Sequence, residues 1–272
     1  MALFQSEAVT PHTLAREREG LMRELRFNRT RFIDFLGTMA RHYRQPLDRQ
    51  ISIFFHAPQS GTAYADVPLW WRLGRCLIPH PGERNRGVPV LGADGEMDVL
   101  YDIAQTMPIK GNVPTKLTWA FDPERDRNAL AQIGLSEGST AQERIVAACA
   151  QLAKGQAAPQ EELAALGAAY VVLARLGMDA EDAVGLPLLM AAYQDVDAEA
   201  LLQAIHQVAE TVLDPIARAV RERERSENDV HREGSPDFAD GAATGRAGTE
   251  RGGATPAAAS DRPPVPDRDG LL

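Results

Sequence analysis

Two adjacent tryptophans and two arginines stand close together in the segment WWRLGR, residues 70–75. A tryptophan ring can stack on a nucleobase, and an arginine guanidinium can pair with a phosphate. If the segment is helical, all four side chains fall within two turns, so at least one ring and one guanidinium share a face. Their types and spacing therefore indicate binding chemistry, although in a Trp-Trp pair one ring usually belongs to the core.

Arginines gather in the first part of the chain, although the chain as a whole is acidic. The 272 residues carry a formal net charge of -9, but residues 23–86 hold 11 basic and 5 acidic side chains. Residues 129–222 hold 5 basic and 13 acidic side chains. A polyanion responds to local charge more than to net charge. Arginines that border an apolar stripe, such as Arg41 and Arg44, are interpreted either as a solvated flank or as phosphate contacts.

The sequence lacks the motifs of several enzyme classes. It contains no H-E-x-x-H zinc motif, no Gly-Lys-Ser/Thr phosphate loop and no G-x-G-x-x-G fingerprint. Cys76 and Cys149 lie far apart and suggest neither a disulfide framework nor a metal knuckle. A buried thiol is favoured for Cys76, because no base is identified for it. We therefore expect a non-enzymatic cytoplasmic protein without cofactor, metal or membrane span.

The elements that must position the Trp-Arg segment lie between residues 50 and 106. An apolar run that favours a helix comes first. Residues 64–74 then favour a second helix, because Asp66 suits its N-cap, Pro68 its first turn and Gly74 its C-terminal cap. This helix would present the tryptophans and arginines.

Short strands are predicted after this helix. Residues 76–78 and 88–91 form two apolar segments, and the sequence GADGE then suits a hairpin turn. In the strand that follows, 97–103, two sets of side chains alternate, so one face should be buried and the other largely exposed. The two sets are Met97, Val99, Tyr101 and Ile103 on one face, and Asp98, Leu100 and Asp102 on the other.

Helical spacing of apolar residues predicts helices over much of the remaining chain. The predicted ranges are 13–27 with Thr13 as cap, 30–45 ended by Pro46, 140–155, 159–177, 179–194 and 197–216. Trp119 is predicted to be a core residue rather than a stacking platform. From about Arg223 the chain has almost no large apolar residues and should be disordered. The result is an α+β protein with N-terminal helices, a small antiparallel sheet, a helical bundle and a disordered tail. Its expected domains are 1–128, 129–222 and 223–272.

This order of parts resembles the N-terminal domain of ArdC-type antirestriction proteins, which also opens large helicase and methylase proteins of conjugative elements. The matching features are FLGTMARHYRQPLDRQISIFFHAP, the W-x-x-x-x-R helix end in WWRLGR, the strand GVPV and the closing strand YDIAQT. The segment AAYVVLARLGMD, residues 168–179, resembles a helix that follows this module. The turn before GVPV is less basic here than is usual in the family. The resemblance implies non-specific binding of single-stranded DNA during plasmid or transposon transfer.

On this hypothesis, bases stack on Tyr64, Trp70 and Trp71, and a set of cations contacts the phosphates. The predicted cations are Arg41, Arg44, Arg72, Arg75, Arg84, Arg86 and Lys110. Two alternatives remain open. The acidic helical half could bind another protein, as an adaptor or as a DNA mimic that inhibits a restriction enzyme. The chain could also be a truncated remnant of a larger helicase or methylase protein.

Overall fold

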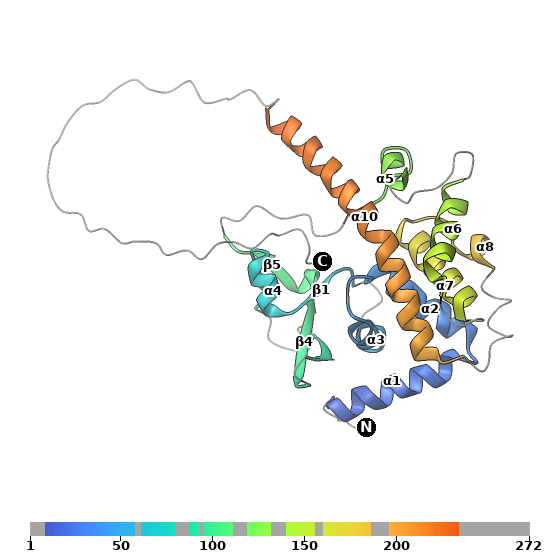
Figure 1. Cartoon of the computed structure of the whole chain (residues 1–272). Helices are drawn as coiled ribbons and strands as arrows, with labels where there is room; N and C mark the ends of the chain where they lie inside the picture. The colour runs from blue at the N-terminus through green and yellow to red at the C-terminus, as the bar shows by residue number, and fades with distance from the viewer. Residues whose placement is uncertain are drawn as a thin grey trace, which may run out of the picture. The chain divides into compact units, whose positions relative to one another are not determined.

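The computed structural model of the protein describes residues 9–57, 61–79, 87–92, 95–110, 119–131, 140–155, 160–185 and 196–233. The chain divides into two units, Met1–Arg221 with Leu272, and Glu222–Leu271. The first unit combines N-terminal helices, small antiparallel sheets and further helices (Figure 1). The predicted α+β class is confirmed.

Three helices open the described chain: α1 (Pro11–Leu25), α2 (Arg29–Arg41) and α3 (Leu47–His56). The hydroxyl of Thr10 accepts a hydrogen bond from the Thr13 amide at 3.2 Å and caps α1. The prediction of Thr13 as the cap is therefore wrong, because Pro11 already suits the first turn. Helix α2 ends at Arg41, before Pro46, and the intervening turns lead into α3.

The later helices are α5 (Arg127–Ala131), α6 (Ala141–Ala153), α7 (Gln160–Arg175), α8 (Glu181–Val184) and α10 (Ala198–Glu233). Thr140 and Glu143 form a capping box at the start of α6. Gly177, with φ 70°, follows α7 at the predicted stop. Helix α10 continues beyond residue 222, where the tail was expected to begin, and residues 234–272 lie outside the described part.

One hydrophobic core joins helices from the beginning and the end of the first unit. Phe35 of α2, Leu173 of α7 and Leu202 of α10 are all fully buried in it. Gly167 permits the close contact between α7 and α10, because a Cβ there would lie 2.5 Å from Cδ1 of Ile205. Residues on both sides of the predicted boundary between the first two domains therefore share this core.

Within the described part of the chain, five short strands form two antiparallel sheets. They are β1 (Tyr64–Ala65), β2 (Arg75–Leu77), β3 (Val88–Leu91), β4 (Met97–Asp102) and β5 (Thr106–Pro108). The first sheet has the order β1-β4-β3, and the second pairs β2 with β5. Strands β3 and β4 form the predicted hairpin, in which Val88 opposes Leu100. The two predicted strands 76–78 and 88–91 thus belong to different sheets.

The buried side of β4 differs from the simple expectation of an apolar face inside and a polar face outside. Leu100 and Asp102 are buried, whereas Met97, Val99 and Tyr101 are half-buried. The Asp102 carboxylate accepts hydrogen bonds from the amides of Thr62 at 2.8 Å, Ala63 at 3.2 Å and Ala104 at 2.8 Å. A buried carboxylate is tolerated here because backbone donors surround it. It fixes the segment before β1 against β4 and caps the 3-10 helix η2 (Ile103–Gln105).

Helix α4 (Val67–Arg72) carries the tryptophan pair. The Asp66 carboxylate caps it by accepting a hydrogen bond from the Leu69 amide at 2.7 Å. Gly74, with φ 74°, ends the segment and leads directly into β2. The predicted caps of this helix are confirmed, but its predicted range of 64–74 is wrong at the start, because Tyr64 and Ala65 pair with β4 as strand β1. Among the described residues, no helix is both long and apolar enough to cross a membrane.

Candidate functional site

The structure places eight of the ten predicted binding residues, and these eight lie in two parts of the fold. Arg41, Arg44 and Tyr64 line one pocket. Trp70, Trp71, Arg72, Arg75 and Lys110 belong to α4 or to the strands β2 and β5 and their ends. Arg84 and Arg86 lie outside the described residues.

Trp70 is a core residue, and the prediction that a base stacks on it is wrong. Its side chain is 0% exposed and packs with Ala63, Ala65 and Leu73. The indole N–H donates a hydrogen bond to the Tyr101 carbonyl at 3.0 Å. Both faces of the ring are therefore covered by protein, and its one polar group is satisfied.

Tyr64 is also buried, at 2% exposure, so stacking of a base on its ring is likewise a wrong prediction. Its ring meets the ring of His42 edge-on, with centroids 5.3 Å apart. The hydroxyl lies beside Gly61, where a Cβ would come within 1.9 Å of it. This hydroxyl has no hydrogen-bond partner among the described residues. The Tyr64 hydroxyl is therefore an unsatisfied buried group, and the ring has no free face.

Trp71 remains available for stacking. Its side chain is 59% exposed, and the neighbouring Arg72 is exposed as well. The Ile109 amide donates a hydrogen bond to the Gly74 carbonyl at 2.9 Å, which brings the exposed Lys110 to the end of α4. One exposed ring and two exposed cations thus belong to the same small part of the fold.

Arg75 has a structural function in this part of the fold. Its Nε donates a hydrogen bond to Thr106 Oγ1 at 2.7 Å, and its Nη2 donates to the Thr106 carbonyl at 3.0 Å. These bonds cross between β2 and β5, whose register pairs Arg75 with Pro108. Part of the guanidinium is therefore already used to hold the two strands together.

The second place is a pocket of about 320 Å³ that we call the Arg41–Arg175 pocket. Its lining residues are Arg41, His42, Tyr43, Arg44, Gln45, Thr62, Ala63, Tyr64, Trp119 and Arg175. Three of them are arginines, and none is a carboxylate. Arg41 is exposed, so the pocket is accessible from solvent on its side.

Elements far apart in sequence assemble this pocket. Arg41 is the last residue of α2 and Arg175 the last residue of α7. The Gln45 side chain donates a hydrogen bond to the Tyr64 carbonyl at 2.8 Å and ties the turn after α2 to β1. Gln50 of α3 donates to the carbonyls of His42 at 3.1 Å and Gln45 at 2.7 Å. The turn that carries the lining residues is therefore held from both sides.

Two of the three pocket arginines make no ion pair with any described residue. Arg44 pairs with Asp214 at 3.1 Å. Among the described residues, Arg41 donates only to Thr38 Oγ1, at 3.1 Å. Arg175 donates to the Trp119 carbonyl at 3.1 Å, and its guanidinium carbon lies 4.3 Å from the centre of the Trp119 ring. Most of the N–H groups of Arg41 and Arg175 thus remain for a ligand.

Burial, and to a smaller extent neighbouring charges, shift the pKa values of three groups in this pocket. Burial, and then the charges of Arg41 and Arg175, lower the pKa of His42 from 6.5 to about 4. Burial lowers the pKa of Arg175, and the nearby Arg221 and Arg44 lower it further. Burial and Asp102 raise the pKa of Tyr64 to about 12, so its hydroxyl keeps its proton at neutral pH. The pocket therefore combines two cations that pair with no described carboxylate and a neutral tyrosine hydroxyl.

His42 should make stability depend on pH. We expect a loss of about 3 kcal/mol between pH 7 and pH 4, because His42 is protonated near pH 6.5 in the unfolded chain and near pH 4 in the folded one. Stability is then full above pH 6.5 and falls as the pH drops towards 4. Arg41, Arg175 and the Tyr64 ring face this imidazole.

Urea unfolding at pH 7, 5.5 and 4 checks this expectation in the protein and in His42→Phe. Phenylalanine keeps an aromatic ring beside Tyr64 but does not titrate, so the variant should lose about 3 kcal/mol less over this range. The imidazole has no hydrogen bond to a described residue that the substitution would break. Equal losses in the two proteins would contradict the assignment to His42.

Sequence reasoning missed several lining residues, Arg175 above all. It lies in the acidic half of the chain, where a single cation within the run AYVVLARLG is the only signal. Trp119 was predicted to be core, and it is buried in the main core, but it also lines the pocket. Tyr43 lines the pocket too, with its hydroxyl held by Arg44 Nε at 3.0 Å.

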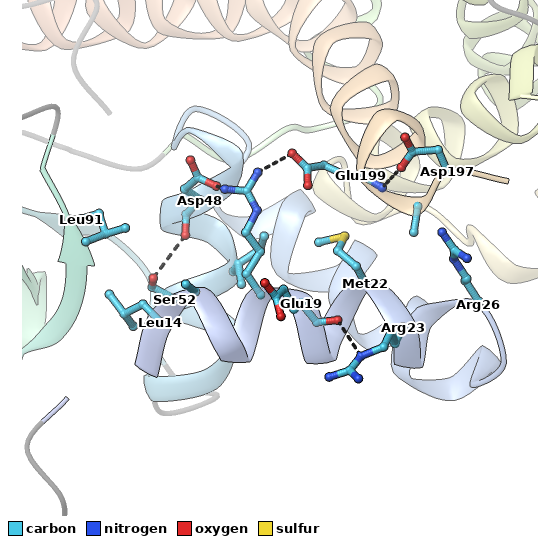
Figure 2. A pocket seen from close by; sticks show the side chains of 14 residues that line it. Leu14, Glu19, Met22, Arg23, Arg26, Asp48, Ser52, Leu91, Asp197 and Glu199 are labelled. Carbon is cyan, nitrogen blue, oxygen red and sulfur yellow. Dashed lines mark hydrogen bonds and ion pairs between the residues drawn. The ribbon is translucent and has the colours of Figure 1, made fainter. Parts of the chain in front are cut away.

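A larger pocket of about 550 Å³ has a different character (Figure 2). It lies between α1, α3 and the start of α10, and its central Arg18 is paired with Asp48 at 2.7 Å and with Glu199 at 2.5 Å. Glu19 and Asp197 add two further carboxylates to the lining (Figure 2). The acidic lining residues outnumber the basic ones, so this pocket is the weaker candidate for an anionic ligand.

Comparisons of the chain with protein-family models, with curated proteins and with solved structures give no match. Among the described residues, no group of three or more His, Cys, Asp and Glu side chains could hold a metal ion. The functional conclusion therefore depends on the Arg41–Arg175 pocket, on the exposed Trp71 and on the sequence motifs.

Proposed function

We propose that the protein binds single-stranded DNA without base specificity, through the Arg41–Arg175 pocket and the exposed Trp71. The observation that carries the proposal is the pocket lining, in which three arginines and no carboxylate surround about 320 Å³. A DNA phosphate would contact Arg41 and Arg175, whose charges no described carboxylate neutralises.

The aromatic contribution favours a single strand over a duplex. A base in a duplex has both faces covered by its neighbours, whereas an unpaired base can stack on an exposed ring. Trp71, at 59% exposure, offers such a ring beside the exposed Arg72. Stacking on one ring contributes about 1 to 3 kcal/mol and accepts any base.

The sequence motifs agree with this proposal. The ordered segments from FLGTMARHYRQP to YDIAQT resemble the N-terminal domain of ArdC-type antirestriction proteins. On that likeness, the strand bound would be DNA in transfer on a plasmid or another mobile element. The protein would then act as a binding module and not as an enzyme.

A fluorescence-anisotropy titration tests the proposal with one labelled oligonucleotide, presented single-stranded and annealed to its complement. The single strand should bind more tightly, and its affinity should fall as salt rises from 50 to 200 mM, with a log-log slope of about -0.7 per phosphate contact. Oligonucleotides of different base composition should bind alike. Absence of binding at 50 mM salt, or tighter binding of the duplex, would overturn the proposal.

A further inference from the structure

We infer that the Arg41–Arg175 pocket receives a phosphorylated end of a DNA strand, with the terminal phosphate monoester between Arg41 and Arg175. This inference deepens the proposed function and rests on it. Three properties of the pocket favour a strand end over the interior of a strand. They are its volume, its charge and its hydrogen-bond donors.

The size of the pocket suits one nucleotide unit. A volume of about 320 Å³ lies at the lower end of the range for small-ligand sites, about 300 to 1,000 Å³. Proteins that follow the interior of a strand instead use a groove that spans several nucleotides. The buried side chains of His42, Tyr43 and Trp119 form part of the lining. A terminal group fits a site of this volume better than a continuous backbone does.

The charge of the pocket matches a monoester. A phosphate monoester carries about -1.5 to -2 charges at pH 7, whereas an internal diester carries one. Arg44 is already paired with Asp214, which leaves the charges of Arg41 and Arg175. A single monoester therefore matches both charges, whereas a single internal diester matches only one of them.

The donors of the pocket match a monoester as well. A monoester presents three terminal oxygens, each of which accepts hydrogen bonds. Arg175 Nε and the Tyr64 hydroxyl are buried and have no hydrogen-bond partner among the described residues. Buried donors are costly to leave unpaired, so a ligand that accepts from them gains affinity. Because the Tyr64 hydroxyl stays protonated, it can donate to an anion without losing a proton.

Competition and direct binding with oligonucleotides of one sequence test this inference on the full chain. The set contains a 5′-phosphorylated strand, a 3′-phosphorylated strand and the strand with two hydroxyl ends, together with the matching mononucleotide and inorganic phosphate as competitors. We expect at least one phosphorylated strand to bind about tenfold or more tightly than the unphosphorylated strand. The mononucleotide should compete for the pocket more weakly than that strand.

Two variants assign the gain to the pocket. Arg41→Gln alters an exposed residue and should fold normally, and Arg175→Gln removes the second cation. In each, the affinity ratio of phosphorylated to unphosphorylated strand should fall towards one. Arg23→Gln, which changes an exposed arginine of α1 outside this pocket, should keep the full ratio. Melting curves establish that each variant is folded.

The outcomes separate this inference from the proposed function. If all three strands bind equally and with salt dependence, the strand-end inference is overturned while single-strand binding stands. If the mononucleotide binds and no strand does, both are overturned, and the pocket takes a free nucleotide. If the gain survives in both Arg41→Gln and Arg175→Gln, the terminal phosphate binds elsewhere and the inference fails.

Discussion

Replacing Arg41 and Arg175 together by glutamine should weaken single-stranded DNA binding about 100-fold at low salt. Each guanidinium makes one hydrogen bond within the described protein and no ion pair there. A hydrogen bond to a charged group contributes about 1.5 to 3 kcal/mol, so two lost contacts at the lower value amount to about 3 kcal/mol. Glutamine keeps a polar side chain but removes the charge and most of the N–H donors of the guanidinium.

Titration at several salt concentrations measures both the affinity and its salt dependence in this double variant. The log-log slope should become less steep by about 0.7 for each lost phosphate contact. The double variant Arg23→Gln/Arg26→Gln is the matched control, because both residues are exposed on or beside α1 and neither lines the Arg41–Arg175 pocket. An equal loss in the control would mean that overall charge, and not the pocket, determines binding.

Trp70→Ala should destabilise the protein by about 3 to 5 kcal/mol, whereas Trp71→Ala should change its stability by less than about 1 kcal/mol. Trp70 is 0% exposed, and its indole N–H bonds to the Tyr101 carbonyl at 3.0 Å. Its removal leaves a cavity between α4 and the sheets and takes away that donor. Trp71 is 59% exposed, so alanine there removes little packing.

Urea unfolding of the two single variants at neutral pH checks the difference in stability. The DNA titration tests Trp71 instead, through binding and not through stability. Trp71→Ala should lose about 1 to 3 kcal/mol of binding free energy if a base stacks on the ring. Trp71→Phe, which keeps an aromatic face, should retain most of the affinity. If Trp71→Ala binds DNA as well as the unchanged protein does, the stacking assignment is wrong although the pocket contacts stand.

The two tryptophans show where sequence reasoning reaches its limit. The helix that carries them is determined locally, because Asp66 and Gly74 lie within a few residues of the ends that they cap. The capping box of Thr140 and Glu143 is local in the same sense. The orientation of the helix is not local. Adjacent positions differ by about 100° around a helix axis, so contact with distant residues decides which indole is covered.

Contacts with residues distant in sequence also decide which face of β4 is buried. The alternation of side chains along Met97–Asp102 could be predicted from the sequence. Which of the two faces is buried could not be predicted. Leu100 turns towards Ile53 and Val90, and Asp102 finds its donors at Thr62 and Ala63. A buried carboxylate cannot be predicted from the period of the strand, because two of its three hydrogen-bond donors lie 39 and 40 residues away.

The sequence by itself determined the α+β class, most helix ends, the β3–β4 hairpin and the concentration of arginines in the first part of the chain. These features depend on caps, turns and periodicity, which operate over a few residues. The tertiary structure alone decided that Trp70 is buried and Trp71 exposed, and that Arg175 joins Arg41 around one pocket. Residues 134 positions apart meet there because α2 and α7 pack in a common core, and packing depends on side-chain contacts that no local pattern contains.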